Sequence, residues 1–287
     1  MKPLVIFHRH CQDGFASACV VAFAESTQGR EVEFLPAKYG DAPPDVTGRR
    51  VFVVDFSYSV DVMLALAARS AGLVWIDHHE TTKDYAAQLA GQSGVVLAAW
   101  SAEHCGATLT WRELVGGIEP EVPAPLRYVE DRDLWRWALP RSREMSAGFA
   151  ALWGPTWDDP SSCWAKFVTD GRLSEAEHVG SFLLVAQAER VRLARRRAEV
   201  VKVKGWGKGL KALAVNASSD VSEIGEALCI EDGADVAVVY FRGEDGRWVH
   251  SLRSRGGVDV SAIAKLYGGG GHKAAAGFTA DMPVVLW

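Results

Sequence analysis

Short runs of apolar residues alternate with helical patterns through the first half of the chain. The runs Leu4–Phe7, Val51–Asp55 and Gly72–Ile76 predict buried strands, and the segments Phe15–Ala24 and Val60–Ser70 predict helices. Apolar strands that are separated by helices are typical of a parallel sheet whose two faces are both covered. The first half therefore predicts an α/β domain with a parallel sheet.

The middle of the chain changes character twice. Residues 104–115 and 125–131 predict two further helices, and the Trp- and Pro-rich sequence of residues 134–164 then interrupts the periodicity. Residues 174–202 form a long helical segment that is apolar early and basic late. We interpret this segment as the connector between two domains.

A second unit is predicted after a turn at residues 205–209. It contains a strand (Leu210–Val215), a helix (Val221–Leu228), a hairpin with its turn at Gly243–Gly246, and a helix (Val260–Leu266). Because a hairpin joins antiparallel strands, this sheet is expected to be mixed.

The length of 287 residues agrees with two domains at about 150 residues each. We predict an α/β protein with a parallel-sheet N-terminal domain over residues 1–172. A helical connector over residues 173–204 leads to a smaller mixed-sheet α/β domain over residues 205–287.

Composition excludes several classes of protein. With 48% hydrophobic and 23% charged residues the chain is expected to fold and to be soluble, and its net charge of −5 argues against coating long nucleic acid by charge alone. The five cysteines are scattered and contain no C-x-x-C pair, which favours a reducing cytoplasm over a disulfide framework or a zinc ribbon. The first apolar run is too short for a signal peptide or a membrane span. We therefore expect a cytoplasmic protein.

Polar residues follow each of the three early strands. Leu4–Phe7 is followed by His8 and, five residues later, by Asp13; the second run ends at Asp55, and the third leads into Asp77–His79. The carboxyl ends of parallel strands open on one edge, where ligands of open α/β folds bind. That edge is expected to gather at least three carboxylates and up to four imidazoles.

Carboxylates that are crowded together repel one another unless protons or cations neutralise them. Oxygen ligands mixed with imidazoles suit Mn²⁺ or Mg²⁺, and more than four candidate ligands favour two ions that share a carboxylate. A single Asp at a strand end is often a helix cap, and a lone His is often a structural residue. Three coincident strand ends favour the metal site.

The segment Tyr128–Trp135 contains a fourth acidic cluster. It is either a solvated charge run at the end of a helix or the source of one further metal ligand, Asp131 or Asp133. Helical periodicity does not choose between these interpretations.

The second unit contains a glycine-rich loop that ends in a histidine. Glycines allow the backbone to approach a ligand closely and to present N–H groups to an anion, although a flexible linker is the alternative. The residues concerned are Gly268, Gly269, Gly270, Gly271 and His272.

The strand that follows the hairpin turn ends in Ser251-Leu252-Arg253-Ser254-Arg255. Alternation places Ser251, Arg253 and Arg255 on one face, which predicts a grip for a phosphate and a nucleobase. Exposed arginines on an edge strand are the alternative.

These motifs resemble those of the DHH phosphoesterase family, which is named for the tripeptide seen here as Asp77-His78-His79. Asp55 in VFVVDFS resembles the second family motif, and Asp131 or Asp133 the fourth. The segment GGGGHKAAAG over Gly268–Gly277 is similar to the signature of the family's C-terminal substrate-binding domain. The resemblance covers nearly the whole chain.

The resemblance implies a two-domain hydrolase of phosphodiester or phosphoanhydride bonds that uses two divalent ions, usually Mn²⁺, with Mg²⁺ as the alternative. It implies a catalytic role for Asp77, His78 and His79, with His79 near the scissile phosphate and Asp55 bridging the metals. The implied metal ligands are His8, Asp13, Asp55, His78 and Asp131, with Asp77, His10, Cys11 and Asp133 as further candidates.

The first motif departs from the family pattern. This chain reads His8-Arg9-His10-Cys11-Gln12-Asp13-Gly14, so that Cys11 stands where many members carry an Asp. His10 or Cys11 could substitute as a ligand, which leaves open the occupancy of the second metal site and the identity of its metal.

The expected function is that of a phosphodiesterase that converts short linear substrates, such as the dinucleotides pGpG and pApA or nanoRNA, into nucleoside monophosphates. Alternatives are a phosphomonoesterase or polyphosphatase, and a catalytically silent nucleotide sensor. The expected partner is a short nucleotide, with neither a membrane nor a long duplex nucleic acid, and a homodimer is left open.

Overall fold

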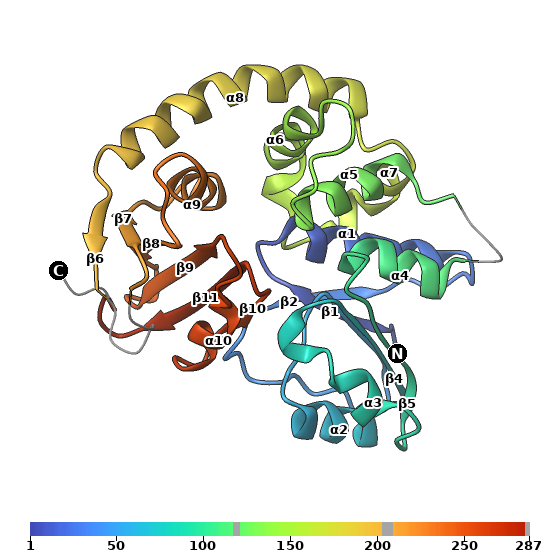
Figure 1. The fold of residues 1–287 in the computed structure, drawn as a ribbon. Helices are drawn as coiled ribbons and strands as arrows, with labels where there is room; N and C mark the ends of the chain where they lie inside the picture. The colour runs from blue at the N-terminus through green and yellow to red at the C-terminus, as the bar shows by residue number, and fades with distance from the viewer. Residues whose placement is uncertain (117–120, 203–208, 285–287) are drawn as a thin grey trace. The chain divides into compact units, whose positions relative to one another are not determined.

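The computed structural model describes residues 1–116, 121–202 and 209–284, and the predicted turn at residues 205–209 lies outside this part of the chain except for its last residue. The chain divides into two compact units, Met1–Leu184 and Val185–Trp287 (Figure 1). They are described separately below.

The N-terminal unit is built on a five-stranded, all-parallel sheet in the order β2-β1-β3-β4-β5 (Figure 1). Its strands are β1 (Leu4–His8), β2 (Glu33–Ala37), β3 (Arg50–Val54), β4 (Gly72–Asp77) and β5 (Val95–Trp100). The three strands predicted from apolar runs are β1, β3 and β4, and they occupy the centre of the sheet. The two edge strands, which the sequence pattern did not indicate, are only partly buried.

Helices cover both faces of this sheet. Alternate residues such as Val5 and Phe7 pack with α1 and α4, whereas Leu4 and Ile6 pack with α2 and α3. Every residue of the central strands therefore has an apolar neighbour, which explains their near-continuous apolar sequence. The helices are α1 (Gln12–Ser26), α2 (Val60–Arg69), α3 (Tyr85–Leu89) and α4 (Gly106–Leu114), with a short 3₁₀ turn at Glu80–Thr82 between β4 and α3.

A second helical cluster packs against the outer side of α1. Its core includes Phe15, Phe149 and Phe167, and the rings of Phe15 and Phe167 lie 4.9 Å apart, centre to centre, in an edge-to-face arrangement. The Trp- and Pro-rich segment, which the sequence suggested to be aperiodic, contributes one of these helices, α6, and the first residue of α7. The cluster contains α5 (Ala124–Asp133), α6 (Ser142–Trp153), α7 (Trp164–Thr169) and the start of α8 (Leu173–Arg195).

The predicted connector is α8, but its C-terminal boundary was wrong. The helix ends at Arg195, and Glu199–Val201 forms the edge strand β6 of the second sheet, paired with β7 (Ala212–Asn216). Val200, at the middle of β6, is exposed on one face while Val201 is buried on the other. This alternation is the strand signal that the continuous basic character of the segment obscures.

The C-terminal unit contains a six-stranded sheet in the order β10-β11-β9-β8-β7-β6, in which only β7 and β8 are parallel. One face packs with α9 and the end of α8, and the opposite face packs with α10. The predicted hairpin is β8–β9, so the mixed sheet is confirmed. The further elements are β8 (Val236–Arg242), β9 (Trp248–Ser254), β10 (Gly270–Gly271), β11 (Ala275–Ala280), α9 (Val221–Ile230) and α10 (Val260–Lys265).

A neutral histidine lies in the core of the C-terminal unit. His250 is fully buried, and its ring stacks on Phe278 at 4.5 Å, centre to centre. Its Nδ1 lies 3.2 Å from the Trp248 carbonyl oxygen, and its Nε2 accepts a hydrogen bond of 2.9 Å from the backbone N–H of Val284. Burial lowers the pKa of His250.

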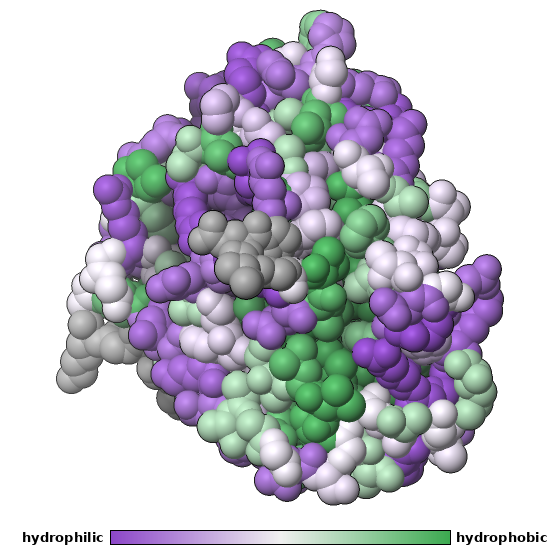
Figure 2. All heavy atoms as spheres, turned by 90° about the vertical axis from the view of Figure 1, so that its right-hand side faces the viewer, coloured by the Kyte–Doolittle hydropathy of each residue, from purple (hydrophilic) through white to green (hydrophobic). Residues whose placement is uncertain are grey.

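Figure 2 shows a face of the molecule on which apolar residues form a patch among polar ones. In Figure 1 this is the side toward which α4 and the edge strand β5 lie, and Val96 of β5 has 66% of its surface exposed.

Among the helices that the structure describes, none combines the length and the apolar character needed to cross a bilayer.

Candidate metal centre

The three central strands bring their polar ends to one edge of the sheet, as predicted. His8 is the last residue of β1, Asp55 directly follows β3, and Asp77 is the last residue of β4. Asp55 has a φ of +51°, a left-handed conformation that is uncommon for an aspartate, and its N–H still donates to the Ile76 carbonyl at 3.0 Å. The backbone thus leaves the sheet with the Asp55 side chain held at its edge.

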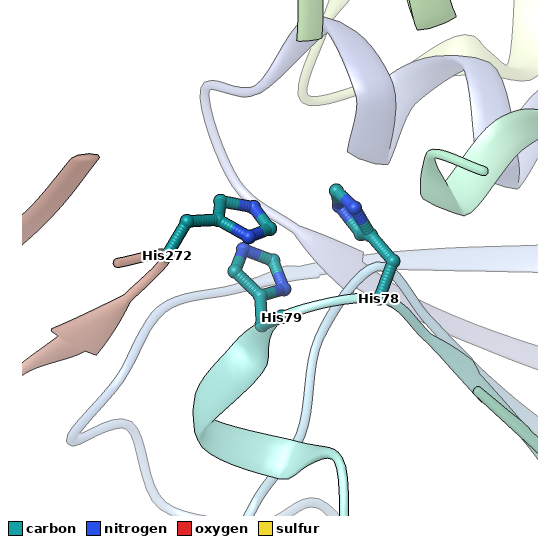
Figure 3. Close-up of side chains that lie close together, drawn as sticks. All are labelled: His78, His79 and His272. Carbon is teal, nitrogen blue, oxygen red and sulfur yellow. The ribbon is translucent and has the colours of Figure 1, made fainter. Parts of the chain in front are cut away.

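His78 lies at the centre of a group of carboxylates. Its Nε2 is 3.1 Å from Oδ1 of Asp55, 3.3 Å from Oδ2 of Asp13 and 3.6 Å from Oδ2 of Asp133. Figure 3 shows His78 beside His79 at the carboxyl end of β4, with their ring centres 4.8 Å apart. His272, drawn in the same view, belongs to the C-terminal unit.

Asp13 is fixed by the start of a distant helix. Its Oδ2 accepts a hydrogen bond of 2.7 Å from the N–H of Gly106, and its Oδ1 accepts one of 2.8 Å from the N–H of Ala107. These are the first two residues of α4, whose free N–H groups and positive dipole end favour a carboxylate. Asp13 therefore joins α1 to α4 and directs an oxygen at His78.

Asp77 is fully engaged with donors of its own chain. Its Oδ1 accepts hydrogen bonds from the N–H groups of His78 and His79 and lies 2.7 Å from Nδ1 of His79. Its Oδ2 accepts from the hydroxyls of Ser57 at 3.1 Å and Thr82 at 2.9 Å. Asp77 thus orients the His79 ring, in the way that outer carboxylates orient ligand histidines.

Two other carboxylates keep open oxygens. Oδ2 of Asp55 and Oδ2 of Asp133 are both buried, and neither has a hydrogen-bond partner within the described ranges. A buried, unpartnered carboxylate oxygen is costly unless a cation satisfies it. The arrangement fits the binding of divalent cations, for which carboxylate oxygens and imidazole nitrogens are suitable ligands.

The titration of the cluster reflects this crowding. Burial, together with Asp55 and Asp133, raises the pKa of Asp13 well above its usual range. Burial alone would lower the pKa of His78, but Asp133, Asp55 and Asp13 outweigh it and raise that pKa well above its ordinary value. A proton on His78 therefore balances part of the negative charge when no other cation is bound.

The structure distinguishes the two aspartates of the fourth motif. Asp131, the ligand implied by the family resemblance, accepts hydrogen bonds from the N–H groups of Ala138 at 2.9 Å and Leu139 at 3.2 Å, so it holds the turn after α5. Asp133 reaches the carboxylate cluster instead. Of the two, Asp133 is the one that lies in a group of potential ligand atoms, and which of them binds a metal stays a prediction.

The structure also separates the two candidate ligands of the first motif, His10 and Cys11. His10 has a φ of +53° and binds Asp158 twice, through its N–H at 2.8 Å and its Nδ1 at 2.9 Å. Its ring is thereby directed away from the carboxylates, whereas Cys11 lies with His8 and Asp55 in a group of potential ligand atoms.

Several groups of potential ligand atoms share residues at the edge of the sheet, among them Asp55, Asp77, His78 and His79, and two further groups carry the argument here. In each of them the ligand atoms lie within 4.8 Å of one another. One group is His8, Cys11 and Asp55, and the other is Asp13, His78 and Asp133. Asp55 lies next to the second group through its contact with His78, and its place between two metals stays a prediction.

Sequence reasoning missed the small and polar residues that support this site. A Cβ on Gly106 would lie 2.8 Å from Cβ of Asp55 and 2.9 Å from Oδ2 of Asp13, and a Cβ on Gly14 would overlap the His8 carbonyl. Asp158 was missed because it is 148 residues from His10 and lies in the Trp-rich segment. No local pattern marks contacts of this kind.

In the C-terminal unit, Arg253 extends along the face of the sheet that α9 covers. Its guanidinium donates hydrogen bonds to the Ser222 hydroxyl at 2.7 Å and to the Leu252 carbonyl at 2.9 Å. A Cβ on Gly225 would lie 2.6 Å from Cγ of Arg253, so this glycine makes room for the side chain. Ser251 and Arg253 alternate with the inward-facing Leu252, as predicted, whereas Arg255 lies beyond the end of β9.

The glycine-rich loop is packed more tightly than predicted. Gly270 and Gly271 form β10, and a Cβ on Gly269 would overlap the Gly277 carbonyl of the neighbouring strand. The N–H groups of Gly269 and His272 donate to carbonyls within the unit, at 2.9 Å and 2.7 Å. These two amides do not face an anion, and the glycines serve the close approach of β11 (Ala275–Ala280).

Three comparisons place the chain among known proteins. Residues 210–283 match the DHHA1 domain family. The chain is 26% identical over 294 residues to an uncharacterized protein of Acanthamoeba polyphaga mimivirus, covering 96% of this chain and 66% of that protein. Its fold is similar to a DHH domain from a member of the s1p family of ribosomal proteins, with a TM-score of 0.57 at 15% identity over 96% and 82% of the two chains.

The fold is also similar to that of RecJ from Thermus thermophilus in complex with Mn²⁺, with a TM-score of 0.54 at 14% identity. That match covers 98% of this chain and 50% of RecJ, so the chain spans about half of that relative. The resemblance that the sequence motifs indicated is thus confirmed for one domain and for the fold: residues 210–283 match the DHHA1 domain, and the chain as a whole has a fold similar to that of a solved DHH domain and of RecJ.

Proposed function

We propose that the chain is a metal-dependent phosphodiesterase that hydrolyses short linear nucleotides, such as pGpG or pApA, to nucleoside monophosphates. The observation that carries the proposal is the pair of buried, unpartnered oxygens on Asp55 and Asp133 beside His78. They suit two divalent ions, with Mn²⁺ expected and Mg²⁺ as the alternative. Bound ions of this kind supply an activated water and a clamp for the phosphoryl oxygens.

The carboxylates have separate tasks in this proposal. Asp55 and Asp133 hold the metals through open oxygens, and Asp13 and His78 complete one ligand group. Asp13 is held by α4, so this group keeps its geometry before any ligand binds. Such preorganisation reduces the cost of forming the reactive arrangement.

His79 is the group that we expect to move a proton. Its Nδ1 is held by Asp77 at 2.7 Å, and the contact with Asp77 outweighs the effect of burial and raises the pKa of His79. A raised pKa keeps the ring protonated closer to neutral pH, as a group that assists the departing alkoxide requires. Asp77 acts as the positioning residue of this histidine.

The C-terminal unit is expected to bind the remainder of the substrate. Arg253, with Ser251 on the same face of its strand, carries the charge and hydroxyl suited to a phosphate, and Arg255 and His272 are further candidates. A two-ended grip of this kind favours a substrate of two or a few nucleotides over a long strand, which would need an extended basic and aromatic groove.

A substrate panel tests the proposal. Linear oligonucleotides of two to about ten nucleotides, together with cyclic dinucleotides and polyphosphate, would be assayed with Mn²⁺ and with Mg²⁺ while mononucleotide and inorganic phosphate are measured separately. We expect mononucleotide release to be fastest from dinucleotides, and to be lost in Asp55→Ala. Release of inorganic phosphate alone would show a monoesterase or polyphosphatase, and preference for the longest strands would show a processive exonuclease. Binding of dinucleotides without turnover would show a sensor.

A further inference from the structure

We propose that the Cys11 thiolate is a metal ligand, so that the two halves of the centre differ in the ions they prefer. The subsite formed by His8, Cys11 and Asp55 would take Zn²⁺, Co²⁺ or Fe²⁺ in preference to Mg²⁺. The inference rests on the metal centre of the proposed function and adds the identity of one ligand and the class of metal it selects.

The first support is the donor set. Sγ of Cys11, a ring nitrogen of His8 and a carboxylate oxygen of Asp55 all lie within 4.8 Å of one another, and Nδ1 of His8 is 3.8 Å from Oδ2 of Asp55. Ligands around one zinc ion, at about 2.0–2.3 Å from it, lie about 3.3–3.6 Å from each other in a tetrahedral site. Small side-chain rotations would bring the three atoms to that spacing.

The second support is independent of the thiol. Oδ2 of Asp55 is buried without a hydrogen-bond partner among the residues described, and Asp55 itself is 1% exposed. The Oδ1 atom of the same carboxylate is already occupied by His78 at 3.1 Å. The free oxygen therefore marks a place for a cation on the side of Asp55 where His8 lies.

The backbone holds Cys11 in place before a metal arrives. Cys11 precedes the first turn of α1 in an extended conformation, with its carbonyl accepting a hydrogen bond of 2.9 Å from the N–H of Phe15. On its other side His10 is fixed by two contacts to Asp158. The same contacts remove His10 as a competing ligand, so the thiol is the donor that the first motif offers here beside His8.

Ligand chemistry then separates the two groups. Thiolate sulfur is a soft donor that favours zinc and related transition metals, whereas carboxylate and water ligands suit Mg²⁺ and Mn²⁺. The group of Asp13, His78 and Asp133 contains two carboxylates and no sulfur. Binding at Cys11 releases the thiol proton to solvent, because only the thiolate is a ligand. Mn²⁺ is therefore expected at the group of Asp13, His78 and Asp133, which contains no sulfur.

Cobalt spectroscopy tests the inference without relying on activity. The metal-free chain would be titrated with Co²⁺ while bound cobalt is counted and the thiolate-to-cobalt charge-transfer absorption in the near ultraviolet is recorded. We expect this band in the unaltered protein and in Cys163→Ser, a control at a partly exposed cysteine outside the ligand groups. In Cys11→Ser the band is lost, and Co²⁺ affinity at this subsite falls by more than about 100-fold, beyond the loss typical of outer-shell partners.

The outcomes separate this inference from the proposed function. Bound Co²⁺ without the charge-transfer band, or a band that persists in Cys11→Ser, overturns the sulfur ligand and leaves the phosphodiesterase standing. Failure to bind any Co²⁺, Zn²⁺ or Mn²⁺ overturns the metal centre and this inference with it.

Alkylation of the unaltered protein gives a second measurement that needs no variant. Peptide mass spectrometry would follow the modification of Cys11 and Cys163 side by side. We expect Zn²⁺ to slow modification of Cys11 at least tenfold and to leave Cys163 unchanged, and Mg²⁺ to protect neither. Equal labelling of Cys11 with and without bound Zn²⁺ overturns the inference.

Discussion

Replacement of Gly106 by Ala is expected to disturb both the stability of the N-terminal unit and its metal centre. Gly106 begins α4 and donates its N–H to Asp13. A Cβ at this position would lie 2.8 Å from Cβ of Asp55, 2.9 Å from Oδ2 of Asp13 and 3.0 Å from Oγ of Ser17. The contact with Asp55 is to an atom next to the backbone, so a side-chain rotation does not relieve it.

The magnitude follows from two opposing effects. Over-packing of a tight interior costs about 1–3 kcal/mol, and alanine returns less than about 1 kcal/mol through its higher helix propensity. The net loss of about 1–2 kcal/mol corresponds to a fall of roughly 2–8 °C in the melting temperature for a unit of this size. Because Asp13 and Asp55 must both move, metal affinity is expected to fall by about 10- to 100-fold, as when the support of a ligand is removed.

The assay compares thermal unfolding in EDTA and in Mn²⁺ with metal affinity measured by calorimetry. Gly154→Ala is the matched control, because Gly154 has right-handed helical angles (φ −50°, ψ −41°) and a Cβ there meets nothing within 4 Å. Its effect should stay within about 0.5 kcal/mol. The steric reasoning is refuted if Gly106→Ala matches the unaltered protein in both stability and metal affinity.

Three further results are expected. Asp77→Asn should lower kcat by about 10²- to 10⁴-fold with unchanged metal content, because His79 loses the negative charge that raises its pKa and the carboxylate that fixes its tautomer. An unchanged kcat would contradict this role. Asp133→Asn should raise the melting temperature in EDTA, because a crowded buried carboxylate is removed, and Mn²⁺ should no longer stabilise this variant. If Mn²⁺ raises the melting temperature of the variant as much as that of the unaltered protein, Asp133 is not a ligand. Burial lowers the pKa of His250 in the folded state, so unfolding takes up a proton when the pH falls below about 6.5. The free energy of unfolding should therefore decrease in that range, and it should decrease less in His250→Gln.

The architecture was largely accessible from the sequence because its strongest signals are local. β1, β3 and β4 are buried on both faces and carry uninterrupted apolar residues, which is the pattern that a central parallel strand requires. β2 and β5 lie at the edges of the sheet, where partial burial weakens the pattern, and Pro36 in β2 obscured it further. The end of α8 was misplaced because the basic residues of its last turn continue almost up to β6.

The ligand set was less accessible because it depends on which face of a helix meets the sheet edge. Asp131 and Asp133 both belong to α5, and their spacing of two residues places them on different sides of the helix. Only the packing of α5 against α1 and α4 decides that Asp133 reaches His78. The role of Cys11 depended likewise on Asp158, which removes His10 and belongs to a segment whose periodicity was unreadable.

The four aspartates of this site have the same side chain but different roles. What distinguishes them is whether their carboxylate oxygens already accept hydrogen bonds from the chain. Asp13 and Asp77 are both almost fully buried, and each of their oxygens already accepts from a donor of the chain, so they fix α4 and His79, while Asp13 also belongs to one ligand group. Asp55 and Asp133 each retain a buried oxygen that accepts no hydrogen bond from the described residues, and the nearest imidazole nitrogens lie 3.8 Å and 3.6 Å away, a cost that folding alone does not offset. Cations that satisfy these two oxygens stabilise the fold and supply the chemistry at the same atoms, so metal-linked stability and turnover should be lost together when either oxygen is removed.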